Sequence, residues 1–212
     1  TLFFSWQNIR RDYPFPFSVI EQQVLTRIDY ALMGTESAAE VWQQKGYTGP
    51  FGVVPQFGVD TTIFTPPERD VKANQQTITI SYIGRLWHGK GINTLIQALS
   101  KLSDLKWQFE IIGSGPEEAA IRQQLTETQL DNRTTVTNWL PSIEMPDRMR
   151  TMDILVLPSR TLSSWKEQYG RVLIEAMASG VVVIGSDSGA IPDVIGDCGL
   201  VVREDDVEHL VE

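Results

Sequence analysis

"KEQYGRVLIEAMASGVVVIG", residues 166–185, joins a polar loop, a short helix and a buried strand, and this unit sets the architecture of the chain. The apolar run behind Gly170 predicts a helix over residues 171–179 that ends at Gly180. The β-branched run that follows predicts a buried strand over residues 181–185. A helix that passes directly into such a strand is typical of parallel α/β layers.

The same segment carries two carboxylates, Glu167 and Glu175, eight residues apart on either side of Gly170. We expect Glu167 on the loop before the helix and Glu175 about one turn inside it, with the unpaired N–H groups of the first turn between them. Such N–H groups form an anion site, so the arrangement suits a ligand that bears both phosphate and hydroxyl groups. A second interpretation stays open, in which Glu167 is a solvated loop charge and Glu175 an acid favoured by the positive end of the helix.

Apolar runs rich in β-branched residues alternate with amphipathic segments along nearly the whole chain, which predicts an α/β fold with parallel sheets. Strands are expected near residues 2–5, 30–34, 51–54, 77–83, 107–112, 133–137, 153–157, 181–185 and 199–202. Helices are expected near residues 17–29, 36–45, 90–103, 116–129, 142–150, 171–179 and 190–195.

The spacing of apolar residues that marks strands and helices stops after Gly58, and a segment with two adjacent prolines and a polar run follows. We therefore expect residues 59–76 to be a linker between a short leading part, residues 1–58, and a longer part, residues 77–212. The chain begins without methionine on an expected strand and stops as a helix begins, so we expect the fold to be truncated at both ends.

Composition narrows the class of partner and the compartment. Eighteen basic against 27 acidic residues give a net charge of −9, which disfavours nucleic acid and anionic membrane surfaces as partners. The single cysteine, Cys198, fits a reducing compartment and is expected to be buried beside Gly196 and Gly199. No apolar run is long enough to span a bilayer, so we expect a soluble, cytoplasmic protein with at most peripheral contact at the inner membrane face.

In open α/β sheets ligands bind at the loops that leave the carboxyl ends of the strands. "GRLWHGKG", residues 84–91, follows such a strand and places Arg85 and Lys90 on a glycine-bounded loop that enters a helix. Two cations beside helix N–H groups suit a diphosphate, and solvated loop charges are the less favoured alternative. His88 in the same loop is expected to be exposed.

Several other classes of site are disfavoured. "GSGPEE", residues 113–118, resembles a dinucleotide fingerprint, but Glu118 stands where its third glycine belongs, which argues against a nicotinamide cofactor. Two histidines, one cysteine and no D-x-D pattern give no metal site. The absence of a G-x-S-x-G elbow argues against a serine hydrolase.

Five ordered segments together resemble the retaining glycosyltransferases of family 4, which have two Rossmann-like domains in the GT-B arrangement. The segments are "YIGRLWHGKGINTLIQAL", "FEIIGSGPEEAAI", "DILVLPSR", "EQYGRVLIEAMASGVVVIGSDSGAIPDVI" and "GLVV". Glu167 and Glu175 match the E-x7-E motif of that family. "IDYALMGTESAAEVWQQKG" and "FGVVPQFGVDTTIF" are similar to the end of its acceptor domain and the crossover into its donor domain. The resemblance thus makes residues 1–58 the end of the acceptor domain and residues 77–212 the donor domain, without its final helices.

The resemblance also implies roles for individual residues. Arg85, Lys90 and Glu167 would be catalytic, with Arg85 and Lys90 on the diphosphate of the donor. The other implied contacts are Gly170, Arg171, Val172 and Leu173 for the diphosphate, Glu175 for the ribose, Glu167, Gln168 and Tyr169 for the transferred sugar, and Gly113, Ser114, Trp139 and Leu140 for the base.

The implied reaction transfers a hexose from a nucleoside-diphosphate sugar, with a UDP-sugar favoured, to a glycan or a lipid-linked acceptor. The anomeric configuration would be retained, and neither a metal nor another cofactor would be needed. The first half of the acceptor domain is missing from the resemblance. We therefore expect this chain to bind the donor and expect turnover only of the full protein. Two rivals stay open: a nucleotide-sugar epimerase, which would release free sugar or an isomer without an acceptor, and a donor-binding module without turnover.

Overall fold

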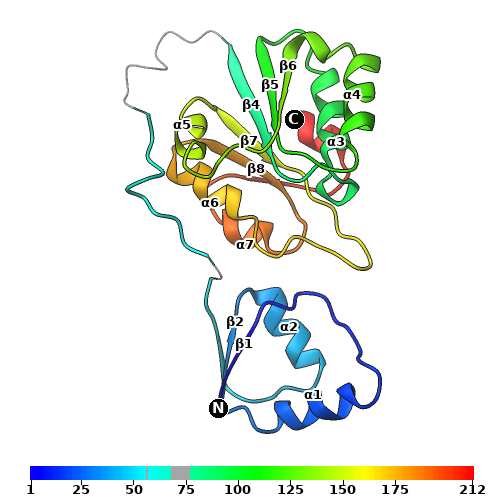
Figure 1. Cartoon of the computed structure of the whole chain (residues 1–212), viewed down its shortest axis with the longest axis vertical. Helices are drawn as coiled ribbons and strands as arrows, with labels where there is room; N and C mark the ends of the chain where they lie inside the picture. The colour runs from blue at the N-terminus through cyan, green and yellow to red at the C-terminus, as the bar shows by residue number, and fades with distance from the viewer. Residues whose placement is uncertain (56, 68–76) are drawn as a thin grey trace.

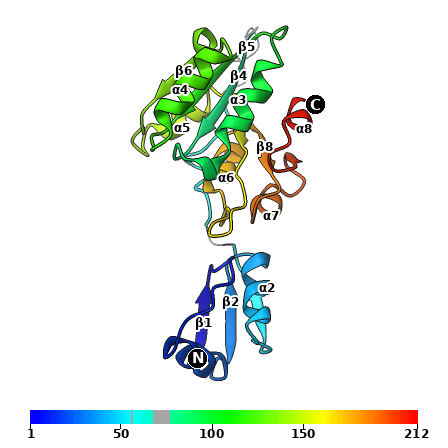
Figure 2. The ribbon, with the colours of Figure 1, turned by 90° about the vertical axis from the view of Figure 1, so that its right-hand side faces the viewer.

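A computed structural model describes residues 1–55, 57–67 and 77–212, and in it the chain forms two parallel β-sheets (Figure 1). The smaller sheet has the order β1-β2-β3, with β1 at Leu2–Ser5, β2 at Tyr30–Met33 and β3 at Phe51–Val53. Two helices accompany it, α1 at Phe17–Leu25 and α2 at Glu36–Gln44. Helix α2 lies along one side of this sheet in Figure 2, where Ala38 and Trp42 pack with Ala31 and Met33 into a small core.

The larger sheet has six strands in the order β6-β5-β4-β7-β8-β9, and all neighbours are parallel. The strands are β4 at Ile78–Ile83, β5 at Trp107–Ile112, β6 at Thr134–Thr137, β7 at Ile154–Leu157, β8 at Val182–Ser186 and β9 at Leu200–Val202. The chain runs from β4 outward to β6 and then returns to β7 on the other side of β4. The strand order therefore reverses between β4 and β7, which is where doubly wound sheets bind ligands.

Helices cover both faces of the larger sheet, so two separate cores form. Helices α3 (Ile92–Ser100), α4 (Glu118–Glu127) and α8 (Val207–Val211) pack on one face, and α5 (Met145–Met149), α6 (Arg171–Ala178) and α7 (Ile191–Ile195) on the other. Successive side chains of β4 point to opposite faces of the sheet, so β4 contributes to both cores: Tyr82 belongs to the first and Ile83 to the second.

The predicted α/β class with parallel sheets is confirmed, and every predicted helix and strand is present with ends shifted by a few residues. The helix expected over 90–103 begins only at Ile92, because His88–Lys90 forms a separate 3-10 turn. A second such turn spans Asp131–Arg133. Of the linker predicted at 59–76, residues 68–76 lie outside the described residues.

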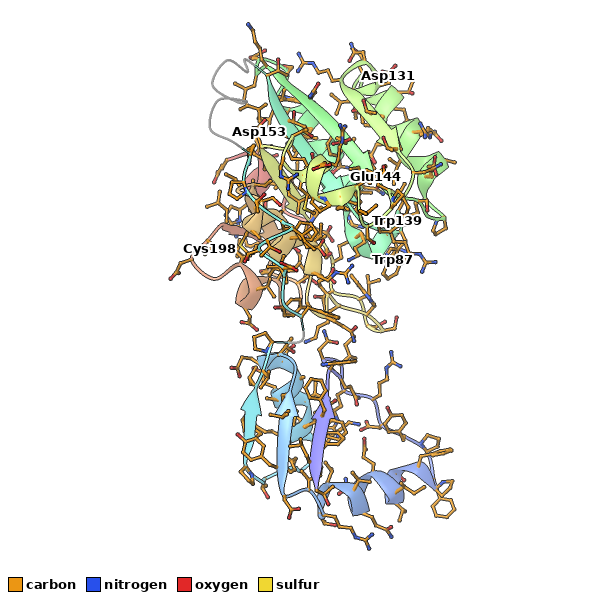
Figure 3. The ribbon with its side chains drawn as sticks, turned by 60° about the vertical axis from the view of Figure 1, so that its left-hand side comes forward. Trp87, Asp131, Trp139, Glu144, Asp153 and Cys198 are labelled. Atoms are coloured by element: carbon orange, nitrogen blue, oxygen red, sulfur yellow. The ribbon has the colours of Figure 1, made fainter. Side chains whose placement is uncertain are left out.

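Cys198 is exposed, so the prediction of a buried cysteine is wrong. The reason is that Cys198 lies in the turn between α7 and β9 rather than under an element. Figure 3 shows it on the opposite side of the larger unit from Trp87 and Trp139. Within residues 1–55, 57–67 and 77–212, no helix has the length and hydropathy that a membrane span requires.

Candidate functional site

A cavity of about 420 Å³ opens at the point where the strand order reverses. Gly84 and Arg85 line it from the loop after β4, Leu157 from the end of β7, and Arg171 and Val172 from the first turn of α6. Its volume falls in the range of small-molecule sites. The loops that the sequence analysis selected at the strand ends therefore surround one cavity.

Arg85 and Lys90 both reach this cavity, but their charges are compensated differently. Nζ of Lys90 donates to Oε2 of Glu167 at 2.5 Å. The Arg85 side chain is exposed and has no hydrogen-bond or ion-pair partner in the part of the chain that the structure describes. The main chain of Arg85 is anchored, because the hydroxyl of the buried Tyr82 donates to its carbonyl oxygen at 2.9 Å. Arg85 is therefore the uncompensated cation of the cavity.

Glu167 is buried, with only 8% of its surface exposed, so the interpretation as a solvated loop charge is wrong. The hydroxyl of Ser159 donates to the same oxygen as Lys90, at 2.9 Å. The Glu167 carbonyl oxygen accepts from the Asn8 amide at 3.0 Å and from the backbone N–H of Ala190 at 3.2 Å. Burial raises the pKa of the nearby Tyr82 hydroxyl, and the charge of Glu167 raises it further. Glu167 is thus held in place by its hydrogen bonds at the edge of the cavity.

The first turn of α6 supplies the predicted anion site only in part. Gly170, with φ of 76°, caps the helix in the left-handed region that favours glycine. The Leu173 N–H donates to the carbonyl oxygen of Gly170 at 2.8 Å, and the Leu173 side chain is fully buried. The predicted contact of Leu173 with the diphosphate therefore gains no support from the structure, because the Leu173 N–H already donates to Gly170. Gly170, Arg171 and Val172 remain on the cavity wall.

Glu175 lies inside α6 as predicted, and its side chain faces the cavity. Burial raises the pKa of Glu175, while the Arg171 guanidinium, 3.0 Å away, opposes the shift. One carboxylate thus stands on each side of the α6 N-terminus, at an edge where a ligand can reach it. A site here for phosphate and hydroxyl groups together stays a prediction.

Two of the four residues predicted to contact the nucleotide base line the cavity. Trp139 and Leu140 line it, whereas Gly113 and Ser114 do not. The carbonyl oxygen of Ser114 instead accepts from the N–H of Leu86 at 2.9 Å, which holds the two loops together. The placement of Gly113 and Ser114 therefore gives no support to base contacts from these two residues.

Two residues predicted to contact the transferred sugar point elsewhere. Gln168 lines a different cavity. The Tyr169 ring is 8% exposed, packs edge-on against Phe57, and its hydroxyl donates to the Phe57 carbonyl oxygen at 2.8 Å. Of the predicted group, only Glu167 faces the cavity.

Sequence reasoning missed several aromatic neighbours of these motifs. Phe57 lines the cavity from the segment that joins the two units. The Trp165 ring lies 5.3 Å from Nζ of Lys90, and Trp87 packs edge-on against it at 4.8 Å. A signal existed, since both tryptophans stand within three residues of a predicted site residue.

Among the described residues no three His, Cys, Asp or Glu side chains come close enough together to hold a metal ion. Metal independence of the reaction stays a prediction.

The doubly wound sheet, with a cavity where its strand order reverses, defines a Rossmann-like unit. The chain belongs to the glycosyl transferases group 1 family, whose model matches residues 77–212.

Named relatives agree with this family. WcaL of Escherichia coli, whose name links it to colanic acid biosynthesis as a glycosyltransferase, is 30% identical over 196 residues, covering 90% of this chain and 48% of WcaL. The GDP-mannose-dependent monoacylated alpha-(1-6)-phosphatidylinositol monomannoside mannosyltransferase of Corynebacterium glutamicum is 31% identical over 187 residues, covering 78% of this chain and 48% of the relative. The chain thus spans about half the length of these curated relatives.

Among solved structures, HepE of Anabaena in complex with UDP has a TM-score of 0.82 at 18% identity, over 99% of this chain and 60% of HepE. This likeness concerns the fold, which is of the GT-B type in both.

Proposed function

We propose that the full protein transfers a hexose from a nucleoside-diphosphate sugar to a glycan or a lipid-linked acceptor. One observation carries the proposal: the uncompensated cation Arg85, the α6 N-terminus and the ribose candidate Glu175 share one cavity at the strand-order reversal. The donor diphosphate would lie against Arg85 and the first turn of α6. The donor sugar would lie toward Glu167 and Lys90.

The charges of this cavity suit the departure of a diphosphate. In the transfer, the acceptor oxygen bonds to the anomeric carbon, and the bond from that carbon to the diphosphate oxygen breaks with its electron pair. The acceptor proton passes to the leaving diphosphate. Fixed donors aimed at this oxygen stabilise the transition state more than the ground state. Arg85, Lys90 and the N–H groups of α6 can supply that stabilisation without a metal.

The retaining course and the UDP-linked donor are part of the proposal. A UDP donor is supported by the fold of HepE, which has been solved with UDP and with UDP-glucose. The Corynebacterium relative is named for GDP-mannose, so the base is a question for direct measurement. We assign no general base among the side chains of the protein.

Calorimetric titration with UDP, GDP, ADP and their glucose or mannose conjugates tests the donor. We expect one nucleotide to bind best, in the presence of EDTA as well as without it. Arg85→Ala should weaken that binding by about 1.5–3 kcal/mol, the value of hydrogen bonds to a charged group. Arg122→Ala, which removes an exposed arginine paired with Glu118 on α4, is the control and should leave it unchanged.

Equal affinity of the wild type and Arg85→Ala would contradict the diphosphate assignment, and a strict need for magnesium would contradict the metal-free site. Release of free sugar or an isomer without acceptor would favour an epimerase. Donor binding by a full-length protein that transfers nothing would favour a binding module.

A further inference from the structure

A second cavity, of about 320 Å³, lies between the segment that follows β1 and the loop that leads into α6. Arg11 and Tyr13 line it from the first segment, and Trp165, Lys166 and Gln168 from the second. Its walls therefore come from both units of the chain. The proposed function leaves it unused.

The second cavity adjoins the proposed donor site through a single stretch of chain. Lys166 and Gln168 line the second cavity, whereas Glu167 between them lines the first. A third cavity, of about 480 Å³, shares Arg85, Lys90 and Glu167 with the first and Trp165 with the second. A group held in the second cavity would thus lie beside the end of the donor at which the sugar is transferred.

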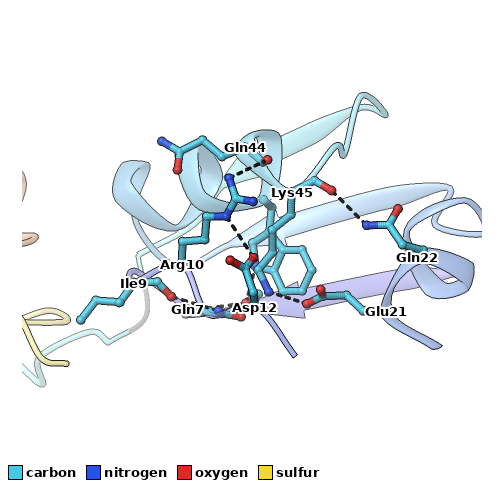
Figure 4. A network of polar contacts seen from close by, with 10 residues as sticks. Gln7, Ile9, Arg10, Asp12, Glu21, Gln22, Gln44 and Lys45 are labelled. Carbon is cyan, nitrogen blue, oxygen red and sulfur yellow. Dashed lines mark hydrogen bonds and ion pairs between the residues drawn. The ribbon is translucent and has the colours of Figure 1, made fainter. Parts of the chain in front are cut away.

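The segment that carries Arg11 is held in place by its neighbours (Figure 4). Nε of Arg10 donates to Asp12 at 3.2 Å, and another nitrogen of Arg10 reaches the carbonyl oxygen of Gln44 at 3.5 Å. The Lys45 ammonium lies 4.7 Å from the centre of the Tyr13 ring. None of these contacts uses the Arg11 side chain, so its guanidinium stays available to a ligand.

The charged side chains that line this cavity are both basic. Arg11 and Lys166 are its only charged lining residues, and neither has an ion-pair partner within residues 1–55, 57–67 and 77–212. Neighbouring cations are paired, Arg10 with Asp12 and Lys90 with Glu167. Two unpaired cations facing one cavity in a chain of net charge −9 favour an anionic ligand.

The rest of the lining suits a sugar. Tyr13 and Trp165 offer aromatic surface for an apolar ring face, and the Gln168 amide can pair with hydroxyl groups. A neutral glycan would use the aromatic and amide groups but would leave both cations without a partner. The lining is therefore complementary to a sugar that also carries negative charge.

We propose that this cavity binds the acceptor, and that the acceptor carries a carboxylate or phosphate group that contacts Arg11 and Lys166. The inference rests on the proposed function, because it takes the first cavity as the donor site. An acidic glycan would supply a carboxylate, and a lipid-linked sugar would supply a diphosphate. Both sources share the anionic group, and the probes below distinguish them.

The first test compares matched charged and neutral probes on the full-length protein saturated with UDP. One pair is methyl β-D-glucuronide and methyl β-D-glucoside. The other is N-acetylglucosamine linked to farnesyl diphosphate and the same sugar linked to farnesol. We expect the charged member of one pair to bind at least tenfold more tightly than its neutral twin, as measured by calorimetry. The pair that shows this preference identifies the source of the charge, and equal affinities within both pairs would overturn the proposal.

The second test removes the cations one at a time. Arg11→Gln and Lys166→Gln should each lower the preference for the charged probe roughly five- to tenfold, with little effect on the neutral probe. Arg10→Gln removes a neighbouring arginine that does not line the cavity, and should keep the preference. A preference that survives both substitutions, or an equal loss for both members of a pair, would overturn the assignment.

The two proposals fail in different ways. If UDP binds and Arg85→Ala weakens it, but no charged probe is preferred, only the acceptor inference is wrong. If no nucleotide binds the wild type, both the donor site and the acceptor inference are wrong.

Discussion

Glu167 joins several parts of the site at the scale of a single residue. Its carboxylate accepts hydrogen bonds from Lys90 and Ser159, and its carbonyl oxygen accepts from Asn8 and Ala190. The side chains of Glu167 and Lys90 are 10% and 17% exposed, so each is largely removed from water. Deleting one partner of such a pair leaves the other charge buried and uncompensated.

We therefore expect Glu167→Ala to lower the free energy of unfolding by about 2 kcal/mol, below the value for a fully buried pair because both side chains retain some exposure. Urea unfolding measures this. Glu175→Ala is the matched control, since its partner Arg171 is 61% exposed and the loss should be under about 1 kcal/mol. The double variant Glu167→Ala/Lys90→Ala should cost less than the sum of the two single substitutions. Strict additivity, or an unchanged unfolding midpoint in Glu167→Ala, would show that the pair adds nothing to stability.

The types of the elements could be predicted because buried strands and amphipathic helices leave different periods in the sequence. Strand β5 was predicted at its observed residues, 107–112. Contacts within loops leave no such period. The hydrogen bond from the Leu173 N–H to the Gly170 carbonyl oxygen depends on the backbone angles of Gly170. Glu167 and Gln168 line different cavities because successive side chains point in different directions. The loops around the cavity could therefore be predicted, whereas the directions of the Gln168 and Tyr169 side chains could not.

At the scale of elements, the turn before α7 positions the loop before α6. Gly189 has φ of 57°, and a Cβ on it would lie 2.0 Å from the carbonyl oxygen of Glu167. Gly196 has a similar φ of 52°, but a Cβ there would meet no atom within 4 Å. Alanine is thus disfavoured at both positions by the positive φ, but only at Gly189 would its Cβ clash with another residue.

Gly189→Ala and Gly196→Ala should each cost about 1–3 kcal/mol of stability, because side chains rarely adopt such positive φ values, with an added cost for the clash at Gly189. Only Gly189→Ala should also displace Glu167, so it alone should weaken binding of a nucleoside-diphosphate sugar. Thermal unfolding and calorimetry on the two variants measure these effects. Equal binding by both variants would mean that the approach of Gly189 to Glu167 does not position the site.

At the scale of the whole molecule, two hydrogen bonds connect the first part of the chain to the α6 loop. The Asn8 amide reaches Glu167 across 159 residues of sequence, and the Tyr169 hydroxyl reaches Phe57 across 112. Asn8 is 5% exposed, so water cannot readily replace its partner. The geometry of the loop before α6 is therefore coupled to the position of the smaller unit.

Asn8→Asp replaces the donated hydrogen bond with a carboxylate that faces a carbonyl oxygen, and this repulsion should let the two units separate. Cys198 is exposed and is the one cysteine of the chain, so it can carry one dye, while Gln23→Cys on the exposed side of α1 carries the other.

Single-molecule energy transfer should give one population for the doubly labelled protein with Asn8 intact. A second population of lower transfer efficiency should appear with Asn8→Asp. Asn132→Asp makes the same change of charge at an exposed position of the larger unit and should keep the single population. Identical distributions for Asn8→Asp and Asn132→Asp would show that the Asn8 contact does not hold the units together.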